Sequence, residues 1–347
     1  MLAFGRQHGL LPLLHKHLDQ TLPGLLPDAV REELRSEASE RVRRNLLLAG
    51  ELGQLLESFD SHRILALPFK GPTLALSVYG DLSLRPFGDL DILVRSSDVP
   101  RSETLLRDRG YAPQLALSPS QEAFHRRWYY ERGFVHSQHG FRVEIQWNVI
   151  PKYFAAPLPD DLWTSMRPLQ LGNWKVNVMS AEHLLLLLCV HGTKHFWSEL
   201  RWLVDVAELV RSSEPFDWDR VVTRARQHGC LRILLLGLAL ARDILEAALP
   251  NGIDAEIAKD RAIPGLIQLV RNRLFGGDDP PTLRETVTFH LRSRERPVDR
   301  IRYCLRLAMT PSIGDFTAIR LPAPLFALYY VIRPARLLTK YGRTPAP

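Results

Sequence analysis

Asp89 and Asp91 are the residues of this sequence whose type and spacing best suit chemistry. They lie in the segment Asp-Leu-Asp-Ile-Leu-Val (89–94), where polar and apolar residues alternate as in a β-strand. Because successive side chains of a strand point to opposite faces, the two carboxylates share one face and Leu90 and Ile92 occupy the other. Two neighbouring carboxylates repel each other unless they are solvated or a cation lies between them, and such oxygen ligands suit Mg²⁺. Two ions held in this way can bind a nucleoside triphosphate and activate an attacking oxygen.

A third carboxylate fits the same scheme. In the segment Arg-Val-Glu-Ile-Gln-Trp (142–147), alternation places Glu144 on the face opposite Val143 and Ile145. An adjacent antiparallel strand would bring Glu144 beside the aspartate pair. The alternative is that all three acids are solvated strand positions with no common role. Their combination with the glycine turn at Gly71 favours a metal-binding site.

These segments resemble the DNA polymerase β-type nucleotidyltransferase superfamily, and more closely its uncharacterised nucleotidyltransferase family of bacterial proteins. The resemblance is carried by a Lys70-Gly71 turn, by Arg85 ahead of Gly88-Asp89-Leu90-Asp91, and by Glu144 shortly before Trp147. It continues into His191-Gly-Thr-Lys-His195 and Arg201-Trp-Leu-Val-Asp205, and it reaches from the N-terminal helices to about residue 245.

The resemblance implies an enzyme that moves a nucleoside monophosphate from an NTP to a hydroxyl or phosphate of a small-molecule or peptide acceptor and releases pyrophosphate. It gives catalytic and metal-binding roles to Asp89, Asp91 and Glu144, with two Mg²⁺ ions, or Mn²⁺, as cofactor. It gives nucleotide-binding roles to Lys70, Gly71, Arg85, Gly88, His191 and Lys194. Gly71 would let the backbone approach phosphate at the start of a helix.

Four departures from the superfamily pattern leave the metal site intact but obscure the substrate. Sixteen residues separate Pro72 from Asp89, which is longer than is usual in the superfamily. Pro72 follows Gly71 and offers no backbone N–H to a phosphate. The third acid is Glu144 where an aspartate is commoner, and Gln146 stands where a histidine is expected. The sequence therefore names neither the NTP nor the acceptor.

Several of these polar residues also have a purely structural interpretation. Arg85 could form a salt bridge with Asp81 or Asp89. Arg201 and Asp205 are four residues apart and are predicted to pair on a helix. His191 and His195 have the spacing of a zinc-binding pair, but the sequence offers no evident third ligand.

The elements around the acids predict an α+β fold with an α/β core. We expect an N-terminal helical segment over residues 1–60, a small mixed-sheet core over 61–178, and a large C-terminal helical domain over 179–347. Residues 246–300 are rich in proline, glycine and charge and predict a loop between helices. The apolar segment 321–332 predicts a buried helix, with a peripheral membrane contact as the alternative.

Composition excludes several classes. The 347 residues are 46% hydrophobic and 24% charged, and 45 Lys and Arg against 38 Asp and Glu give a net charge of +7, which permits an anionic partner without requiring one. The three cysteines are far apart, which argues against a disulfide framework and fits the cytoplasm. No run of about 18 apolar residues predicts a transmembrane segment. Dinucleotide-binding, P-loop and nucleophile-elbow motifs are absent, and no long basic stripe indicates a nucleic-acid partner.

Two other functions stay open at this point. One is a catalytically silent nucleotide-binding or antitoxin-like regulatory protein that keeps the fold without turnover. The other is an enzyme that nucleotidylates a protein or tRNA. The intact set of three carboxylates argues against the first, and the missing basic groove argues against tRNA.

Overall fold

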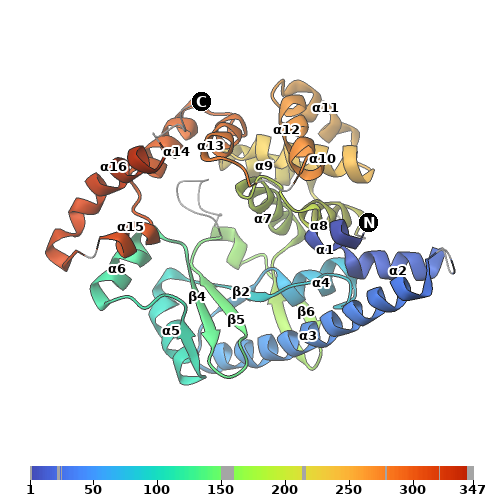
Figure 1. The fold of residues 1–347 in the computed structure, drawn as a ribbon, viewed down its shortest axis with the longest axis horizontal. Coiled ribbons are helices and arrows are strands. Elements are labelled where there is room, and N and C mark those ends of the chain that lie inside the picture. The colour runs from blue at the N-terminus through green and yellow to red at the C-terminus, as the bar shows by residue number, and fades with distance from the viewer. Residues whose placement is uncertain are drawn as a thin grey trace.

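The computed structural model describes residues 2–21, 24, 26–149, 160–212, 216–277, 280–319 and 321–341. Its centre is one mixed sheet with the strand order β1-β2-β5-β4-β3 (Figure 1). The strands are β1 (Ala66–Pro68), β2 (Asp89–Val94), β3 (Tyr111–Pro113), β4 (Glu131–His136) and β5 (Arg142–Gln146). Neighbouring strands run antiparallel except β2 and β5, which are parallel. The predicted α+β class with a small mixed sheet is confirmed.

The two faces of the sheet differ as the alternation predicts. Leu90, Ile92, Val143 and Ile145 are fully buried on one face. They pack against helices α3 (Asp28–Ser61) and α5 (Val99–Asp108), and α3 runs along this side of the sheet in Figure 1. This apolar layer fixes the register of the strands, because a slip by one residue would bury the acids instead.

The connection between β1 and β2 forms the turn and helix predicted there. Helix α4 (Gly71–Tyr79) starts directly after Lys70 and has Pro72 in its first turn, where a missing N–H costs no helical hydrogen bond. It ends at Gly80, whose φ of 69° is the left-handed conformation that glycine adopts without strain.

A second, two-stranded sheet was not distinguished in the sequence. Strands β6 (Arg167–Leu171) and β7 (Trp174–Val178) form an antiparallel hairpin. Its buried residues Leu171, Val176 and Val178 belong to the same core cluster as the apolar face of the main sheet.

Helices make up most of the remaining chain. The central pair is α7 (Ala181–Lys194) and α10 (Leu231–Leu245), whose leucines are buried on nearly every side in the largest core cluster. The others are α1 (Leu2–Gln7), α2 (Leu11–Thr21), α6 (Pro119–Trp128), α8 (Leu200–Arg211), α9 (Trp218–Gln227), α11 (Asn251–Lys259), α12 (Ile263–Phe275), α13 (Leu283–Arg292), α14 (Pro297–Met309), α15 (Ile313–Ala318) and α16 (Tyr329–Tyr341).

The loop predicted over residues 246–300 is wrong. Helices α11, α12 and α13 and the start of α14 lie there. Three of the prolines stand at helix starts: Pro250 precedes α11, and Pro264 and Pro297 lie in the first turns of α12 and α14. Gly276 follows the end of α12. Proline and glycine are compatible with helices at these positions. Pro280 and Pro281 do lie outside helices, between α12 and α13.

The segment 321–332 is only partly buried. It forms a short 3₁₀ helix (Ala323–Leu328) and the start of α16. Phe326 and Tyr329 are buried, whereas Leu325 and Leu328 are exposed and Val331 is 69% exposed. The prediction of a buried helix is therefore wrong for Leu325, Leu328 and Val331. No helix among the described residues is long and apolar enough to cross a membrane.

Two glycines of α3 give a matched test of this packing. A Cβ on Gly53 would lie 2.3 Å from the indole of Trp174, whereas a Cβ on Gly50 would meet nothing within 4 Å. We expect Gly53→Ala to lower the free energy of unfolding by about 1–3 kcal/mol through overpacking. Gly50→Ala should raise it by up to about 1 kcal/mol, because alanine favours the helix. Urea denaturation of both variants checks this, and equal effects would contradict the packing of β7 on α3.

Candidate active site

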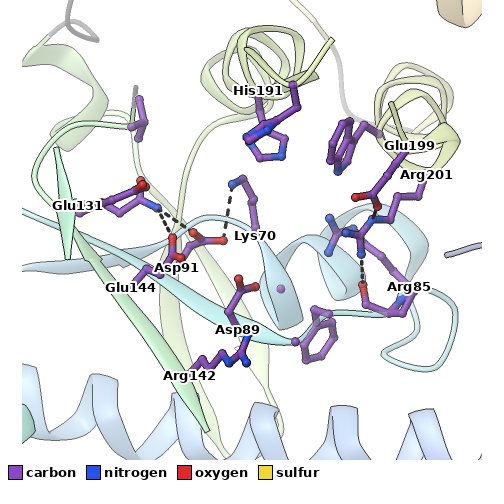
Figure 2. Close-up of a pocket in the computed structure, with 18 of the residues that line it drawn as sticks. Lys70, Arg85, Asp89, Asp91, Glu131, Arg142, Glu144, His191, Glu199 and Arg201 are labelled. Atoms are coloured by element: carbon purple, nitrogen blue, oxygen red, sulfur yellow. Dashed lines mark hydrogen bonds and ion pairs between the residues drawn. The ribbon is translucent and has the colours of Figure 1, made fainter. Parts of the chain in front are cut away.

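Asp89, Asp91 and Glu144 lie side by side on the polar face of the sheet (Figure 2). The expected antiparallel neighbour is wrong: β5 runs parallel to β2, and its antiparallel partner is β4 on its other edge. The parallel register still sets Glu144 directly opposite Asp91 and sets Arg142 opposite Asp89. Residues directly opposite in neighbouring strands share a face, so the three acids face one space.

That space is a cavity of about 880 Å³ between the sheet and helices α7 and α8. Every residue predicted from the sequence for the site lines it: Lys70, Gly71, Arg85, Gly88, Asp89, Asp91, Glu144, His191 and Lys194. The sequence therefore identified the residues that the fold brings to one place.

A fourth carboxylate, Glu131, was missed. It is the first residue of β4, lies opposite Gln146 and lines the cavity. The apolar residues that indicate a strand in the sequence begin only at Phe134, but β4 begins three residues earlier. Continuing the alternation backwards from Val135 through Gly133 would have placed Glu131 on the polar face.

Burial of these acids beside one another disfavours their charged forms. Burial, with repulsion from Asp91, raises the pKa of Asp89. Burial also raises the pKa of Glu131. For Glu144, burial and repulsion by Asp91, Glu131 and Asp89 raise the pKa to about 8. A cation bound between these acids would relieve the repulsion among them.

Asp91 already has two partners on the protein. The Lys70 ammonium lies 3.7 Å from its Oδ2. The Gln146 amide nitrogen donates to its Oδ1 at 2.8 Å and to Glu144 Oε2 at 3.3 Å. Gln146 therefore orients two of the acids from the position where the superfamily pattern expects histidine.

The first turn of α4 lies close to Asp89. Gly71 adopts a φ of +52°, and a Cβ there would lie 3.3 Å from the Asp89 carbonyl oxygen. Glycine is required because both the left-handed backbone and the close approach exclude a side chain. The N-terminus of this helix faces the cavity and is a favourable place for a phosphate.

Arg85 is held by Asp205 and by neither of the acids predicted to pair with it. Its Nε and Nη2 donate to the two oxygens of Asp205 at 2.7 and 2.9 Å, and the Tyr79 hydroxyl donates to Asp205 at 2.7 Å. Burial lowers the pKa of Arg85, but attraction by Asp205 more than reverses this and the pKa is raised overall. The predicted pair of Arg201 with Asp205 is also wrong, since Arg201 pairs with Glu199.

Helices α7 and α8 supply the opposite wall. The ring of Trp202 lies 5.2 Å from that of His191 and 5.4 Å from that of His195, and the Lys194 ammonium donates to the Tyr130 hydroxyl. Burial, together with nearby lysines, lowers the pKa of His191 and brings that of His195 to about 3. Both imidazoles are therefore neutral at pH 7.

The donor set suits Mg²⁺, because Asp89, Asp91 and Glu144 offer carboxylate oxygens alone and, among the residues that the structure describes, Lys70 is the single cation paired with them. In the described part of the chain, no three acidic, histidine or cysteine side chains are already gathered around one point. Binding an ion would therefore require the three carboxylates to turn toward a common centre and Asp91 to release Lys70. The same finding gives the histidine pair no third ligand for zinc among the described residues.

A mixed sheet that sets three carboxylates beside a glycine turn and a helix N-terminus is the arrangement of a nucleotidyltransferase core. The chain belongs to the uncharacterised nucleotidyltransferase family, whose profile matches residues 1–246. The predicted family is thereby confirmed. No curated protein matches the chain.

One solved structure is similar to part of the fold. It is an antigenic nucleotidyltransferase-like protein from Paracoccidioides brasiliensis, with 15% sequence identity and a TM-score of 0.35. The match covers 69% of this chain and 98% of that one.

The ion pair of Arg85 with Asp205 joins the loop before β2 to helix α8, and its loss should be costly. We expect Asp205→Asn to lower the free energy of unfolding by about 3 kcal/mol, because it leaves a buried guanidinium without its counter-charge. Glu208→Gln on the same helix breaks an exposed pair with Arg211 and should change stability by less than about 1 kcal/mol. Denaturant titration checks both, and equal effects would contradict a structural role for the buried pair.

The pKa of Glu144 predicts a pH-dependent stability in the absence of divalent cations. Its ordinary value is 4.5 and its value in the folded protein is about 8, so the folded chain holds this proton more tightly than the unfolded chain. Stability should therefore fall as pH rises between these values. Glu144→Gln should melt at a higher temperature than wild type at pH 8 in EDTA, and the difference should shrink at pH 5 and on adding Mg²⁺. If the melting temperatures of the variant and wild type differ equally under all three conditions, repulsion between Glu144 and the neighbouring acids is contradicted.

Proposed function

We propose that this protein is a Mg²⁺-dependent nucleotidyltransferase, which moves a nucleoside monophosphate from an NTP to a hydroxyl or phosphate of a small-molecule or peptide acceptor. The observation that carries the proposal is the register of β2 with β5, which sets Glu144 opposite Asp91 in a cavity that Gly71 also lines. Membership of the family and this convergence of side chains both support the proposal.

The three acids would have different roles in metal binding and in deprotonation of the acceptor. Asp89 and Asp91 would hold two Mg²⁺ ions, or Mn²⁺, and Glu144 would complete the site nearest the attacking oxygen and assist its deprotonation. The bound ions would neutralise the triphosphate and polarise the phosphorus–oxygen bonds. The acceptor oxygen forms a bond to the α-phosphorus, and the bond from that phosphorus to the bridging oxygen breaks, so pyrophosphate leaves.

The triphosphate would lie along the turn that precedes α4. Lys70, displaced from Asp91 by the metal ions, could pair with a phosphate oxygen, and the backbone at Gly71 and Gly88 leaves room for close approach. Arg85 would have a positioning role, because its ion pair with Asp205 holds the loop 85–88 against α8. A direct contact of Arg85 with phosphate would require it to leave that partner.

The wall of α7 and α8 would receive the rest of the substrates. Neutral His191 beside Trp202 offers flat surfaces on which a base can stack. Lys194 and Glu131 lie at the Glu144 end of the carboxylate row, where the acceptor must enter, and they offer a cation and an anion to its polar groups.

A catalytically silent nucleotide-binding or regulatory protein is the alternative with an observation in its favour. Lys70 and Gln146 already satisfy Asp91, and a lysine in this position can substitute for a metal ion. Such a protein would bind nucleotide without Mg²⁺ and would release no pyrophosphate.

Binding of the four NTPs separates these functions. We expect calorimetric titration to give Mg²⁺-dependent binding of at least one NTP, and we expect Asp89→Asn/Asp91→Asn to weaken it by at least tenfold. Pyrophosphate release with candidate acceptors then tests turnover. The matched control is Asp108→Asn, an exposed acid at the end of α5 that does not line the cavity, and it should bind as wild type does.

Two results would contradict the proposal. If folded wild type binds no NTP in the presence of Mg²⁺, the site does not take nucleoside triphosphates. If binding is equally strong in EDTA and survives loss of both aspartates, the regulatory alternative is favoured.

A further inference from the structure

Three arginines line the same cavity but were not among the residues predicted for the site. Arg41 and Arg44 lie on α3, and Arg142 is the first residue of β5. Arg142 lies beside Asp89, at the end of the carboxylate row away from Glu131 (Figure 2). The cavity therefore has an acidic end and a basic end.

The charges of these arginines are not compensated within the described residues. No hydrogen bond or ion pair joins any of the three to a carboxylate there. Arg41 attracts Glu37 one turn earlier, but Glu37 accepts its hydrogen bonds from Arg6. The other arginines near the cavity have partners: Arg85 has Asp205 and Arg201 has Glu199.

A fixed contact positions Arg41 and Arg44 near the metal-binding acids. The amide of Asn45, which is buried directly after Arg44 on α3, donates to the carbonyl oxygens of Leu82 and Arg85 at 2.7 and 3.0 Å. This turn of α3 is thereby anchored to the loop that leads directly into Gly88 and Asp89. The arginines of this turn therefore lie near the end of the loop that precedes Asp89.

The two ends match the two sides of a phosphoryl transfer. The attacking and leaving oxygens lie on opposite sides of the phosphorus in an in-line displacement. If the acceptor oxygen approaches at Glu144, the leaving pyrophosphate lies toward Asp89 and Arg142. A pyrophosphate group carries several negative charges, and planar guanidinium groups bind phosphate oxygens in pairs.

We propose that Arg41, Arg44 and Arg142 form the binding site for the β- and γ-phosphates and for the leaving pyrophosphate. The inference rests on the proposed function and deepens it, because it assigns the orientation of the donor. It makes the protein selective for triphosphates: a monophosphate has no group to place among these arginines.

The test is calorimetric binding of magnesium pyrophosphate, of the preferred NTP and of its monophosphate. Arg41→Gln/Arg44→Gln and Arg142→Gln should each weaken pyrophosphate and NTP binding by at least tenfold and leave monophosphate binding unchanged. Arg43→Gln is the matched control, because Arg43 lies on the same helix, pairs with Glu40 and does not line the cavity. Unchanged melting temperatures would show that the variants fold, as expected for side chains without protein partners.

The outcomes separate the inference from the function on which it rests. Wild-type binding of NTP that neither arginine variant weakens overturns this inference and leaves the proposed function standing. Wild type that binds pyrophosphate through these arginines but no NTP supports the anion site and overturns the nucleotide donor. Wild type that binds neither ligand overturns both.

Discussion

Repulsion among buried carboxylates is the constraint on which the rest of this structure depends. Asp89, Asp91, Glu131 and Glu144 lie on one face of a small sheet, and burial beside one another raises the pKa of three of them. A fold gains nothing in stability from such an arrangement, since each acid would be better solvated apart. The cost is offset by the opposite face of the sheet, where the apolar strand residues pack fully buried on α3 and α5. A cluster maintained against its own repulsion indicates a site for a cation.

The second wall of the site is fixed by charge as well as by packing. Asp205 is fully buried on α8 and holds Arg85 from the loop before β2. This pair ties the family's arginine motif to its downstream helical motif, so the two motifs are parts of one contact. In the resulting cavity, the acids lie on the sheet and the neutral imidazoles lie on the opposite wall, which α7 and α8 form. The cations that line the cavity include Lys70, Lys194 and the α3 residues Arg41 and Arg44.

Alternation on a strand is a local property, so the sequence predicted that Asp89, Asp91 and Glu144 lie on polar strand faces. The predicted nucleotide-binding residues that line the cavity came from the resemblance to the family. The sequence could not predict the direction of β5, since Glu144 reaches Asp91 in either orientation and only tertiary pairing decides between them. The partner of Arg85 lies 120 positions away on α8, so no spacing rule could find it. Glu131 was missed because the apolar residues that indicate β4 in the sequence begin only at Phe134. The helices within residues 246–300 were missed because proline and glycine are typical of loops as well as of helix ends, so composition alone cannot distinguish the two.

The central claim is that the carboxylate row binds divalent cations with a nucleoside triphosphate. The most direct measurement is a crystal of the full chain with Mn²⁺ and an NTP whose α–β bridging oxygen is replaced by methylene, examined by anomalous scattering at the manganese edge. The account predicts manganese between Asp89 and Asp91, Glu144 turned toward it, and Lys70 moved from Asp91 to a phosphate oxygen. Nucleotide bound in the cavity with no manganese at these acids, and with Lys70 still on Asp91, would contradict it.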